Sequence, residues 1–311
     1  MEERPGIIPG PRIRRLSLRD SIISLIERRH SCRRYYDKPL DPSHRMALEE
    51  FLGSRLEGPL GSRLRMVLLA ATEENRSSLK GLGTYGFIRG ATAFMAGAVR
   101  SSKNDMEDYG YVMEHAVLLA TDLGLGTCWL GGTFTKSSFA RKIRLTHEES
   151  MPAVVAVGYE AEEDLMRSRL RRTVRATERL PREQLFFEGS FLKPLREIQA
   201  PHAQVLEAVR WAPSASNKQP WRIVVTQEAF HLYLQRTKGY GKKSLLFKLL
   251  GLADLQRVDM GIAMCHLELA ARELGLQGKW VMEMPQIPGS NDGLEYVVSW
   301  RTVNLPVEGL S

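Results

Sequence analysis

The sequence predicts an α+β fold in which two copies of one unit are fused in a single chain. Helical and strand-like segments alternate along the 311 residues, and the pattern starts again after an arginine-rich connector. Residues 115–129 align with residues 266–280, and 7 of the 15 aligned positions are identical. Such self-similarity indicates that a supersecondary unit has been duplicated.

Three shorter matches support the duplication, and the offsets of all the matches stay between 151 and 158 residues. The shorter matches pair residues 38–40 with 193–195, 48–49 with 206–207, and 64–67 with 221–224. We therefore expect a basic arm over residues 1–17, a first repeat over 18–190 and a second repeat over 191–311.

The first repeat starts with an apolar helical pattern over residues 18–27. Asp41 and Pro42 are typical of a helix start, which predicts a second helix to about Leu52. The longest helix is predicted over residues 105–123, with an apolar stripe on one face and Gly124 as its terminating residue. Strands are predicted over residues 65–70, 91–99, 125–132 and 152–159, with a short helix over 135–143.

The second repeat begins with a predicted helix over residues 202–210 and a turn-rich loop over 211–220. A strand is predicted over 221–225 and a long helix over 258–274. Two further strands are predicted over 276–281 and 294–300.

Composition and charge limit the classes of function. Hydrophobic residues make up 43% and charged residues 26% of the chain, as in soluble globular proteins. The net charge of +8 fits nucleic acid, an acidic membrane surface or an anionic cofactor. The basic residues gather at 12–34 and 167–182 without a nucleic-acid-binding signature, so we expect no nucleic-acid partner.

The sequence carries no pattern of an export signal or a membrane span. Residues 5–15 lack the apolar region of a signal peptide, and no apolar run approaches the roughly 20 residues that cross a bilayer. Cys32, Cys128 and Cys265 are far apart and form no metal-ligand spacing. We expect a cytoplasmic protein without bound metal or membrane contact.

A dense cationic cluster follows the first predicted helix. Residues 28–36 contain four arginines together with His30 and Ser31. Arginine forks suit phosphate oxygens, so a helix that ends in this cluster can gather donors around an anion. The same arginines can instead be solvated charges that favour a helix C-terminus.

Each repeat lacks the polar motif that the other one keeps. The second repeat has no arginine cluster before Lys193, because residues 186–192 are mostly apolar. The first repeat has no counterpart of the Ser-x-Ser-Asn-x-Gln-Pro run at residues 214–220, since residues 54–60 differ from it. If the repeats pack about a pseudo-twofold axis, one interface keeps both halves of a ligand site and the other has lost both.

Three motifs together resemble the FMN-dependent nitroreductase superfamily. They are Arg29-His30-Ser31-x-Arg33, the run Ala-Pro-Ser-x-Ser-Asn-x-Gln-Pro-Trp at 212–221, and Leu-Gly-Leu-Gly-Thr-Cys-Trp-Leu-Gly at 123–131. The fused order is similar to a subgroup of tandem, pseudo-dimeric nitroreductases, and the resemblance spans about residues 18–301. It implies two nitroreductase-like α+β sandwich units that form a pseudo-dimer within one chain.

The resemblance implies that the first unit holds the phosphate end of FMN. Arg29, His30 and Ser31 would contact the phosphate and the ribityl chain, and Arg33 would lie near the pyrimidine edge of the flavin. A further phosphate-binding arginine is expected near the end of this unit. Arg179 fits best, with Arg171 and Arg172 as alternatives.

The resemblance also implies contacts along the flavin ring and from the second unit. The backbone of three residues would lie along the ring near N5: Leu130, Gly131 and Gly132. Four residues would approach from the opposite half: Pro213, Ser214, Ser216 and Asn217. FMN performs the hydride chemistry itself, so no catalytic side chain of the protein is expected.

The function that the resemblance implies is hydride transfer from NADH or NADPH to a nitroaromatic, quinone or related small acceptor by a ping-pong route. Two alternatives stay open. The first is an FMN-binding storage or sensor protein without turnover, and the second is reductive dehalogenation or flavin-modifying chemistry on the same fold. The chain is expected to act as a monomer.

A few other residues carry expectations of their own. His115 and His266 occupy equivalent places in the two repeats and are expected to pack in the core. Cys128 is expected to be an inert core thiol, whereas the arginines around Cys32 would lower its pKa. Two alternatives stay open for Tyr85. Its side chain either faces the flavin or the substrate, or it has no contact with them. Residues 239–251 fit a lid, a surface helix or a membrane-touching segment.

Overall fold

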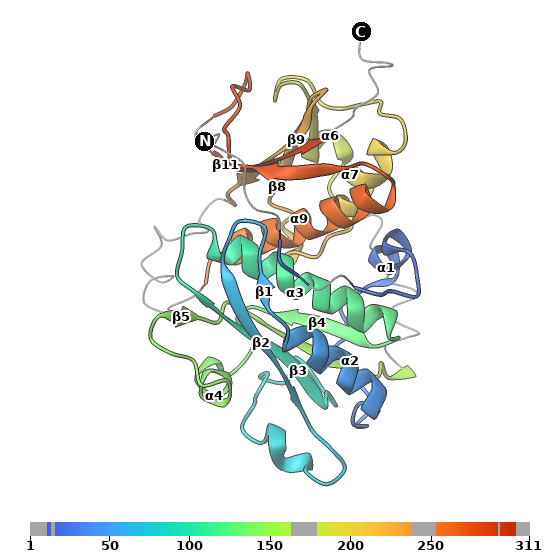
Figure 1. The fold of residues 1–311 in the computed structure, drawn as a ribbon, viewed down its shortest axis with the longest axis vertical. Helices are drawn as coiled ribbons and strands as arrows, with labels where there is room; N and C mark the ends of the chain where they lie inside the picture. The colour runs from blue at the N-terminus through green and yellow to red at the C-terminus, as the bar shows by residue number, and fades with distance from the viewer. Residues whose placement is uncertain (1–10, 14–15, 163–178, 238–252, 292, 303–311) are drawn as a thin grey trace.

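Two β-sheets enclose a pair of long helices in the computed structural model, as Figure 1 shows. The structure describes residues 11–13, 16–162, 179–237, 253–291 and 293–302. The mixed helix and sheet content confirms the predicted α+β class. The expectations for Arg171 and Arg172, for residues 239–251 and for most of the basic arm lie outside the described residues.

The first sheet is antiparallel throughout and belongs to the N-terminal half of the chain. Its strands have the order β1 (Leu56–Glu57), β2 (Arg63–Ala70), β3 (Ala93–Arg100), β6 (Val154–Gly158) and β4 (Gly126–Leu130). A short strand, β5 (Glu149–Ser150), also pairs with β3. Strand β4 therefore lies at the edge of this sheet, and its C-terminal end leads into Gly131 and Gly132.

The second sheet belongs to the C-terminal half. Its strands have the order β10 (Gly278–Val281), β11 (Leu294–Thr302), β9 (Ala229–Gln235), β8 (Trp221–Val225) and β7 (Phe186–Glu188). All pairs are antiparallel except β7 with β8, which is parallel. The sequence did not predict β7 or β9, because β9 carries a continuous apolar run and no turn signal isolates it from β8.

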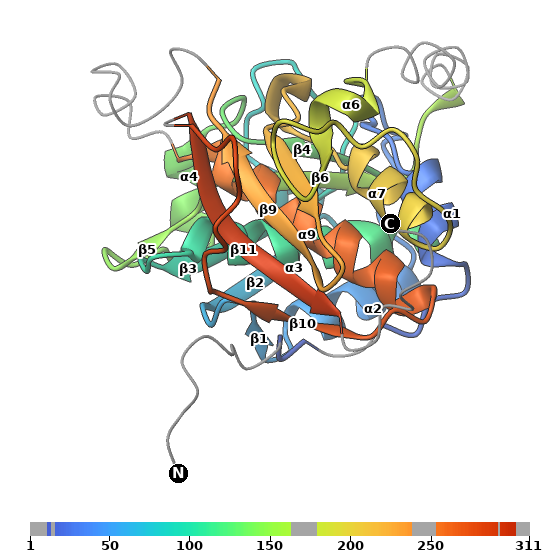
Figure 2. The same cartoon turned by 90° about the horizontal axis from the view of Figure 1, so that it is seen from above.

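Helices α3 (Asp105–Asp122) and α9 (Leu255–Glu273) pack against each other between the sheets (Figures 1 and 2). They cross where Gly110 faces the backbone of Val258 and Gly261 faces the backbone of Glu107. A Cβ atom added at Gly110 would lie 2.1 Å from the Val258 carbonyl oxygen. Only glycine allows the two backbones to approach so closely.

The remaining helices lie around this centre. They are α1 (Ile22–Arg28), α2 (Pro42–Leu52), η1 (Arg76–Leu79), α4 (Lys136–Lys142), α6 (Arg182–Leu185), α7 (His202–Arg210) and η2 (Ala215–Asn217). Helix α1 begins later than predicted because the Ser21 side chain caps it by accepting the Ser24 N–H. Helix α9 begins earlier than predicted because Asp254 caps it in the same way.

The apolar stripe predicted for residues 105–123 is buried in α3, but the burial extends to the other face of the helix as well. Both faces of this helix are covered, one by the first sheet and the other by α9, so its acidic residues are buried too. Glu107 and Glu114 have no exposed surface. Burial is the main reason that the pKa of Glu107 rises to about 7 and that of Asp108 to about 6.

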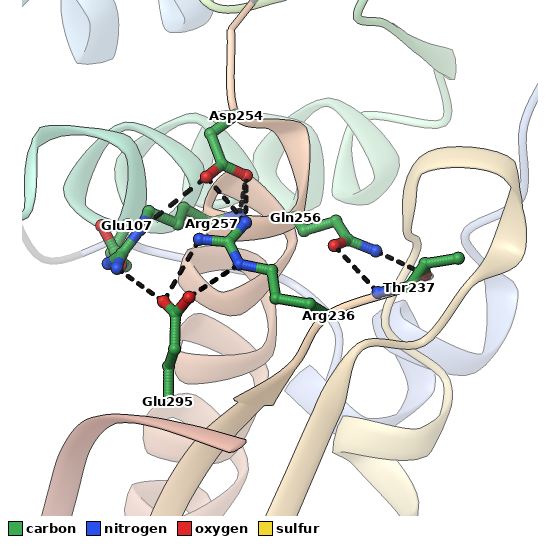
Figure 3. A network of polar contacts seen from close by, with 7 residues as sticks. All are labelled: Glu107, Arg236, Thr237, Asp254, Gln256, Arg257 and Glu295. Atoms are coloured by element: carbon green, nitrogen blue, oxygen red, sulfur yellow. Dashed lines mark hydrogen bonds and ion pairs between the residues drawn. The ribbon is translucent and has the colours of Figure 1, made fainter. Parts of the chain in front are cut away.

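A network of ion pairs joins the start of α9 to α3 and to the second sheet (Figure 3). Arg257 of α9 donates to Glu107 of α3 at 2.5 Å and to Glu295 of β11 at 2.8 Å. Arg236, which follows β9, donates to Glu295 at 3.0 Å and to Asp254 at 2.7 Å. The network fixes the first turn of α9 between the two halves of the chain.

No helix in the described part of the chain has both the length and the apolar character that a bilayer crossing requires.

Candidate functional site

Arg29 is the C-cap residue that follows helix α1, and it is buried, with 4% of its surface exposed. Its guanidinium Nε and Nη2 atoms are buried and have no hydrogen-bond partner among the residues that the structure describes. Burial lowers the pKa of this guanidinium, and the Glu114 carboxylate opposes that shift. A buried cation with unsatisfied donors is costly unless an anion meets it. Arg29 therefore has the chemistry of an anion-binding residue.

The segment after Arg29 lies along the edge strand β4. Ser31 pairs with Thr127 in a parallel bridge, and the Cys32 N–H donates to the Thr127 carbonyl at 2.8 Å. Cys32 itself is fully buried. The predicted phosphate-contact segment and the predicted flavin-contact strand are thus neighbours.

The side chains of His30 and Arg33 contact other residues of the protein. The His30 imidazole contacts Glu160 through Nε2 at 2.6 Å and the Arg28 carbonyl through Nδ1 at 3.1 Å. The Arg33 guanidinium lies 4.9 Å from the centre of the Phe87 ring. Both side chains thus have partners in the N-terminal half of the chain.

The end of β4 meets the start of α9. Leu130 is buried in the core of the first sheet, and Gly131 lies against Leu255, the first residue of α9. A Cβ atom at Gly131 would lie 2.4 Å from the Leu255 Cδ1 atom, so a side chain there would have to displace Leu255. A Cβ atom at Gly132 would meet nothing within 4 Å. The backbone of Gly132 is therefore open to a ligand.

The loop from the second half is tied to the next turn of α9. The Ala215 N–H donates to both carboxylate oxygens of Asp259, at 3.0 and 3.1 Å. Ser216 and Asn217 are exposed and have positive φ angles of 51° and 54°. The Ser214 hydroxyl accepts the Gln219 N–H at 2.9 Å, and Pro213 is half-buried. The loop is thus held in a fixed shape that presents Ser216 and Asn217 at the surface.

Arg179 docks on the same loop. Its Nη1 donates to the Ala212 carbonyl at 2.8 Å and to Asn217 Oδ1 at 3.1 Å. Its Nη2 donates to the Trp211 carbonyl at 2.9 Å. The structure thus brings Arg179 and Asn217 into direct contact, although 38 residues separate them in the sequence.

Two buried carboxylates near these segments were not predicted. Glu114 of α3 accepts the Trp129 indole N–H at 2.8 Å and contacts His266 at 3.0 Å, and Asp259 holds the second-half loop. In the sequence, each is an acidic residue within a mostly apolar helical segment. This pattern could have indicated a buried carboxylate.

Tyr85 is 75% exposed at the tip of a loop that is tied to both predicted flavin-contact segments. The Arg89 N–H of this loop donates to the Arg33 carbonyl at 3.0 Å, and Thr135, just after the β4 turn, donates its N–H to the Gly83 carbonyl at 2.9 Å. The loop therefore lies between these two segments.

Two surface pockets lie in the N-terminal half of the chain, and the second of them is lined in part by Glu160, the partner of His30. One of about 350 Å³ is lined by residues that include Asp37, Lys80, Thr84 and Phe94, and one of about 600 Å³ includes Tyr36, Tyr159 and Glu160. None of the predicted flavin-contact residues lines either pocket. The buried donor atoms of Arg29 define the candidate site instead. A buried cation with unsatisfied hydrogen-bond donors indicates a bound anion more specifically than a surface pocket does.

Solved structures resemble this chain at low sequence identity. A protein from Thermotoga maritima described as a putative nitroreductase matches with a TM-score of 0.55 and 17% identity, over 96% of this chain and 100% of that chain. An FMN-dependent nitroreductase from Clostridium difficile has 18% identity and a TM-score of 0.35, over 44% of this chain and 87% of its own. NfrA2 of B. megaterium has 19% identity and a TM-score of 0.36, over 46% of this chain and 67% of its own.

The first of these similarities supports the nitroreductase fold. Among curated proteins, none matches the chain. The model of the family described as "Putative TM nitroreductase" matches residues 21–271, which include α1, α3, the loop before β8 and α9 up to its last two residues. The chain belongs to this family of the nitroreductase superfamily.

Proposed function

We propose that the protein binds one FMN per chain and transfers hydride from NADH or NADPH to a nitroaromatic, quinone or related small acceptor. The observation that carries the proposal is Arg29, a buried guanidinium with two donor atoms that lack a partner among the described residues. The phosphate of FMN is an anion of the kind that an arginine fork binds.

The site would be shared by two fused units of one fold. Gly110 and Gly261, which lie at the crossing of α3 and α9, are 151 residues apart, and so are Asp108 and Asp259. Asp108 accepts the Leu60 N–H at 2.8 Å, as Asp259 accepts the Ala215 N–H at 3.0 Å. These paired contacts recur at the offset of the best sequence match and support a pseudo-dimer within the chain, with repeats over 18–190 and 191–311.

The residues present fit FMN. Arg29 and Ser31, with His30 beside them, would hold the phosphate and ribityl chain, and Arg33 would lie at the pyrimidine edge. The backbone of residues 130–132 would follow the flavin ring, with Gly132 unobstructed by side chains. Residues 213–217 would contact the cofactor from the second unit. Arg179 would support binding in two ways. Its hydrogen bond would hold the Asn217 side chain in place, and its positive charge would attract the anionic cofactor.

FMN, when bound, accepts hydride and passes it to a second substrate. The chain would supply binding, orientation and positive charge near the flavin. The chain would act as a cytoplasmic monomer, since the second unit takes the place of a partner subunit.

Anaerobic mixing with NADH and NADPH tests the proposed activity. The purified, FMN-loaded protein should lose the visible absorbance of its oxidised flavin with at least one of the two donors, and a nitroaromatic or quinone should restore it. Flavin that stays oxidised with both donors would favour the storage or sensor alternative.

A further inference from the structure

We propose that Asp259 of α9 is a positioning residue for the FMN site. It fixes the loop over residues 213–219 in the conformation in which Ser216 and Asn217 would meet the cofactor. In this role Asp259 acts through the loop and makes no cofactor contact of its own. The inference rests on the proposed FMN function and names the group that keeps the second half of the site in place.

The loop has a strained backbone. Ser216, Asn217 and Gln219 have φ angles of 51°, 54° and 48°. Residues other than glycine rarely adopt this left-handed conformation, so it persists only where surrounding contacts impose it. Ser216 and Asn217 are also two of the residues expected at the cofactor. The loop thus keeps polar side chains at positions that glycine would occupy more easily, and it needs a support.

Asp259 supplies a support directly beside the strained positions. The N–H of Ala215, the residue before Ser216, donates to the two carboxylate oxygens of Asp259 at 3.0 and 3.1 Å. Asp259 is 3% exposed, so water does not replace it as the acceptor. Without this acceptor the Ala215 N–H would lose its partner, and the strained conformation would become less favourable relative to others.

The part of α9 that carries Asp259 is packed against the first half of the chain. Two residues before Asp259, Arg257 forms an ion pair with Glu107 of α3 (Figure 3). Two residues after it, Gly261 lies against the Glu107 backbone. Asp259 therefore fixes the loop relative to the half of the chain that contains Arg29.

The first half of the chain contains a counterpart of this arrangement. Asp108 lies 151 residues before Asp259 and accepts the Leu60 N–H at 2.8 Å and the Ser62 N–H at 2.7 Å. Among residues 58–62, which the structure describes in full, only Gly61 has a positive φ, of 97°. Two matching carboxyl groups thus support two loops. Strained polar residues occur in the loop that Asp259 supports, which is the loop expected at the cofactor.

Three variants separate positioning from general stability. Asp259→Ala removes the acceptor, and Asp108→Ala is the matched control in the first half. Asp259→Asn keeps an oxygen that can accept the Ala215 N–H. The proposed role does not depend on the charge of Asp259, whose pKa burial raises well above the usual range of a carboxyl group. FMN affinity is measured by fluorescence quenching, and amide hydrogen exchange is measured on the flavin-free proteins.

Asp259→Ala should weaken FMN by about tenfold or more, because affinity falls with the fraction of molecules whose loop has the binding conformation. Asp259→Asn and Asp108→Ala should both bind FMN within about threefold of the unchanged protein. Without flavin, the Ala215 amide should exchange about tenfold faster in Asp259→Ala than in the unchanged protein. In Asp108→Ala, the Leu60 and Ser62 amides should exchange faster instead.

Equal losses of FMN affinity in Asp259→Ala and Asp108→Ala would overturn the proposal, because the loss would then follow from general destabilisation. Unchanged FMN affinity in Asp259→Ala, or a loss in Asp259→Asn as large as in Asp259→Ala, would also overturn it. Failure of the unchanged protein to bind FMN would contradict the proposed function instead, and the exchange rates would still test the support of the loop by Asp259.

If Asp259→Ala does not fold, Ala215→Pro removes the same hydrogen bond from the loop side. Proline is allowed there because Ser214, the residue before it, has an extended backbone with a ψ of 156°. Ala215→Pro should also weaken FMN by about tenfold, and an unchanged affinity would overturn the proposal.

Discussion

Gly110 and Gly261 lie on opposite helices where α3 and α9 cross, and each faces the backbone of the other helix. A Cβ atom at Gly261 would lie 1.8 Å from the Glu107 carbonyl oxygen, and one at Gly110 would lie 2.1 Å from the Val258 carbonyl oxygen. This close approach brings the two halves of the chain together. It also places Glu114 and His266, one turn further along each helix, within 3.0 Å of each other.

Gly261→Ala should destabilise the protein by roughly 3 kcal/mol or more, since the added methyl group meets backbone that cannot move aside without separating the helices. Gly132→Ala is the matched control for stability, because its Cβ would meet nothing within 4 Å. Urea unfolding of both variants checks this. A Gly261→Ala protein as stable as Gly132→Ala would show that the helices do not pack as described.

Arg29→Met should weaken FMN binding by at least about tenfold, because each charge-assisted hydrogen bond to phosphate is worth about 1.5–3 kcal/mol. The same change should raise the unfolding free energy of the flavin-free protein by about 1–3 kcal/mol, because it removes a buried charge with two donor atoms that have no hydrogen-bond partner among the described residues. Titration with FMN and urea unfolding measure the two effects.

Arg29→Lys is the control for this prediction. Lysine keeps the positive charge but cannot donate two parallel hydrogen bonds as a guanidinium does. The FMN affinity of this variant should therefore fall between that of the unchanged protein and that of Arg29→Met. An Arg29→Met protein that binds FMN normally would remove Arg29 from the site.

Asn217→Ala should weaken FMN although the residue lies in the proposed second repeat. Its side chain accepts a hydrogen bond from Arg179 at 3.1 Å, so the variant loses both a ligand contact and the support of the loop. We expect a loss of about tenfold in affinity, measured by fluorescence titration. Lys218→Ala, an exposed neighbour, should change the affinity by less than about twofold. If Arg29→Met weakens FMN and Asn217→Ala does not, the shared interface is wrong.

Glu107 should make stability depend on pH. Burial raises its pKa in the folded state from 4.5 to about 7, so the folded protein holds a proton that the unfolded chain releases above pH 4.5. The contribution of Glu107 to stability is therefore complete below about pH 4.5 and is lost as the pH rises through about 7.

Glu107→Gln removes this titration. The stability of the variant relative to the unchanged protein should rise by about 1–3 kcal/mol between pH 5 and pH 8. Urea unfolding at both pH values gives the difference. A difference that stays constant, or that falls with pH, would contradict the burial and pairing described for Glu107.

The sequence predicted most helices and strands closely because their signals are local. The helix over 202–210 and the strand over 221–225 coincide with α7 and β8. Strand β9 was missed, since an apolar run next to another strand carries no alternation of its own. The burial of α3 on both faces could not be read from its sequence either, because it depends on a helix in the other half of the chain.

Local sequence signals also predict only part of the candidate site. The motifs led to the proposal of Arg29 and Asn217 as cofactor contacts, and this proposal follows from residue type and order. The buried state of Arg29 and the hydrogen bonds of Glu114 depend on contacts among α1, α3, β4 and α9, which lie far apart in the chain. His266 was expected to pack in the core, which it does, but its hydrogen bond to Glu114 appears only in three dimensions.

The most direct test of the account is the amount of FMN bound per chain. The protein is saturated with FMN, separated from free flavin and denatured, and the released FMN is counted against protein concentration. The account predicts one FMN per chain, held where the first unit keeps its arginine cluster and the second keeps residues 213–217. Two FMN per chain would contradict the loss of the second interface, and a protein that retains none would contradict the proposed function.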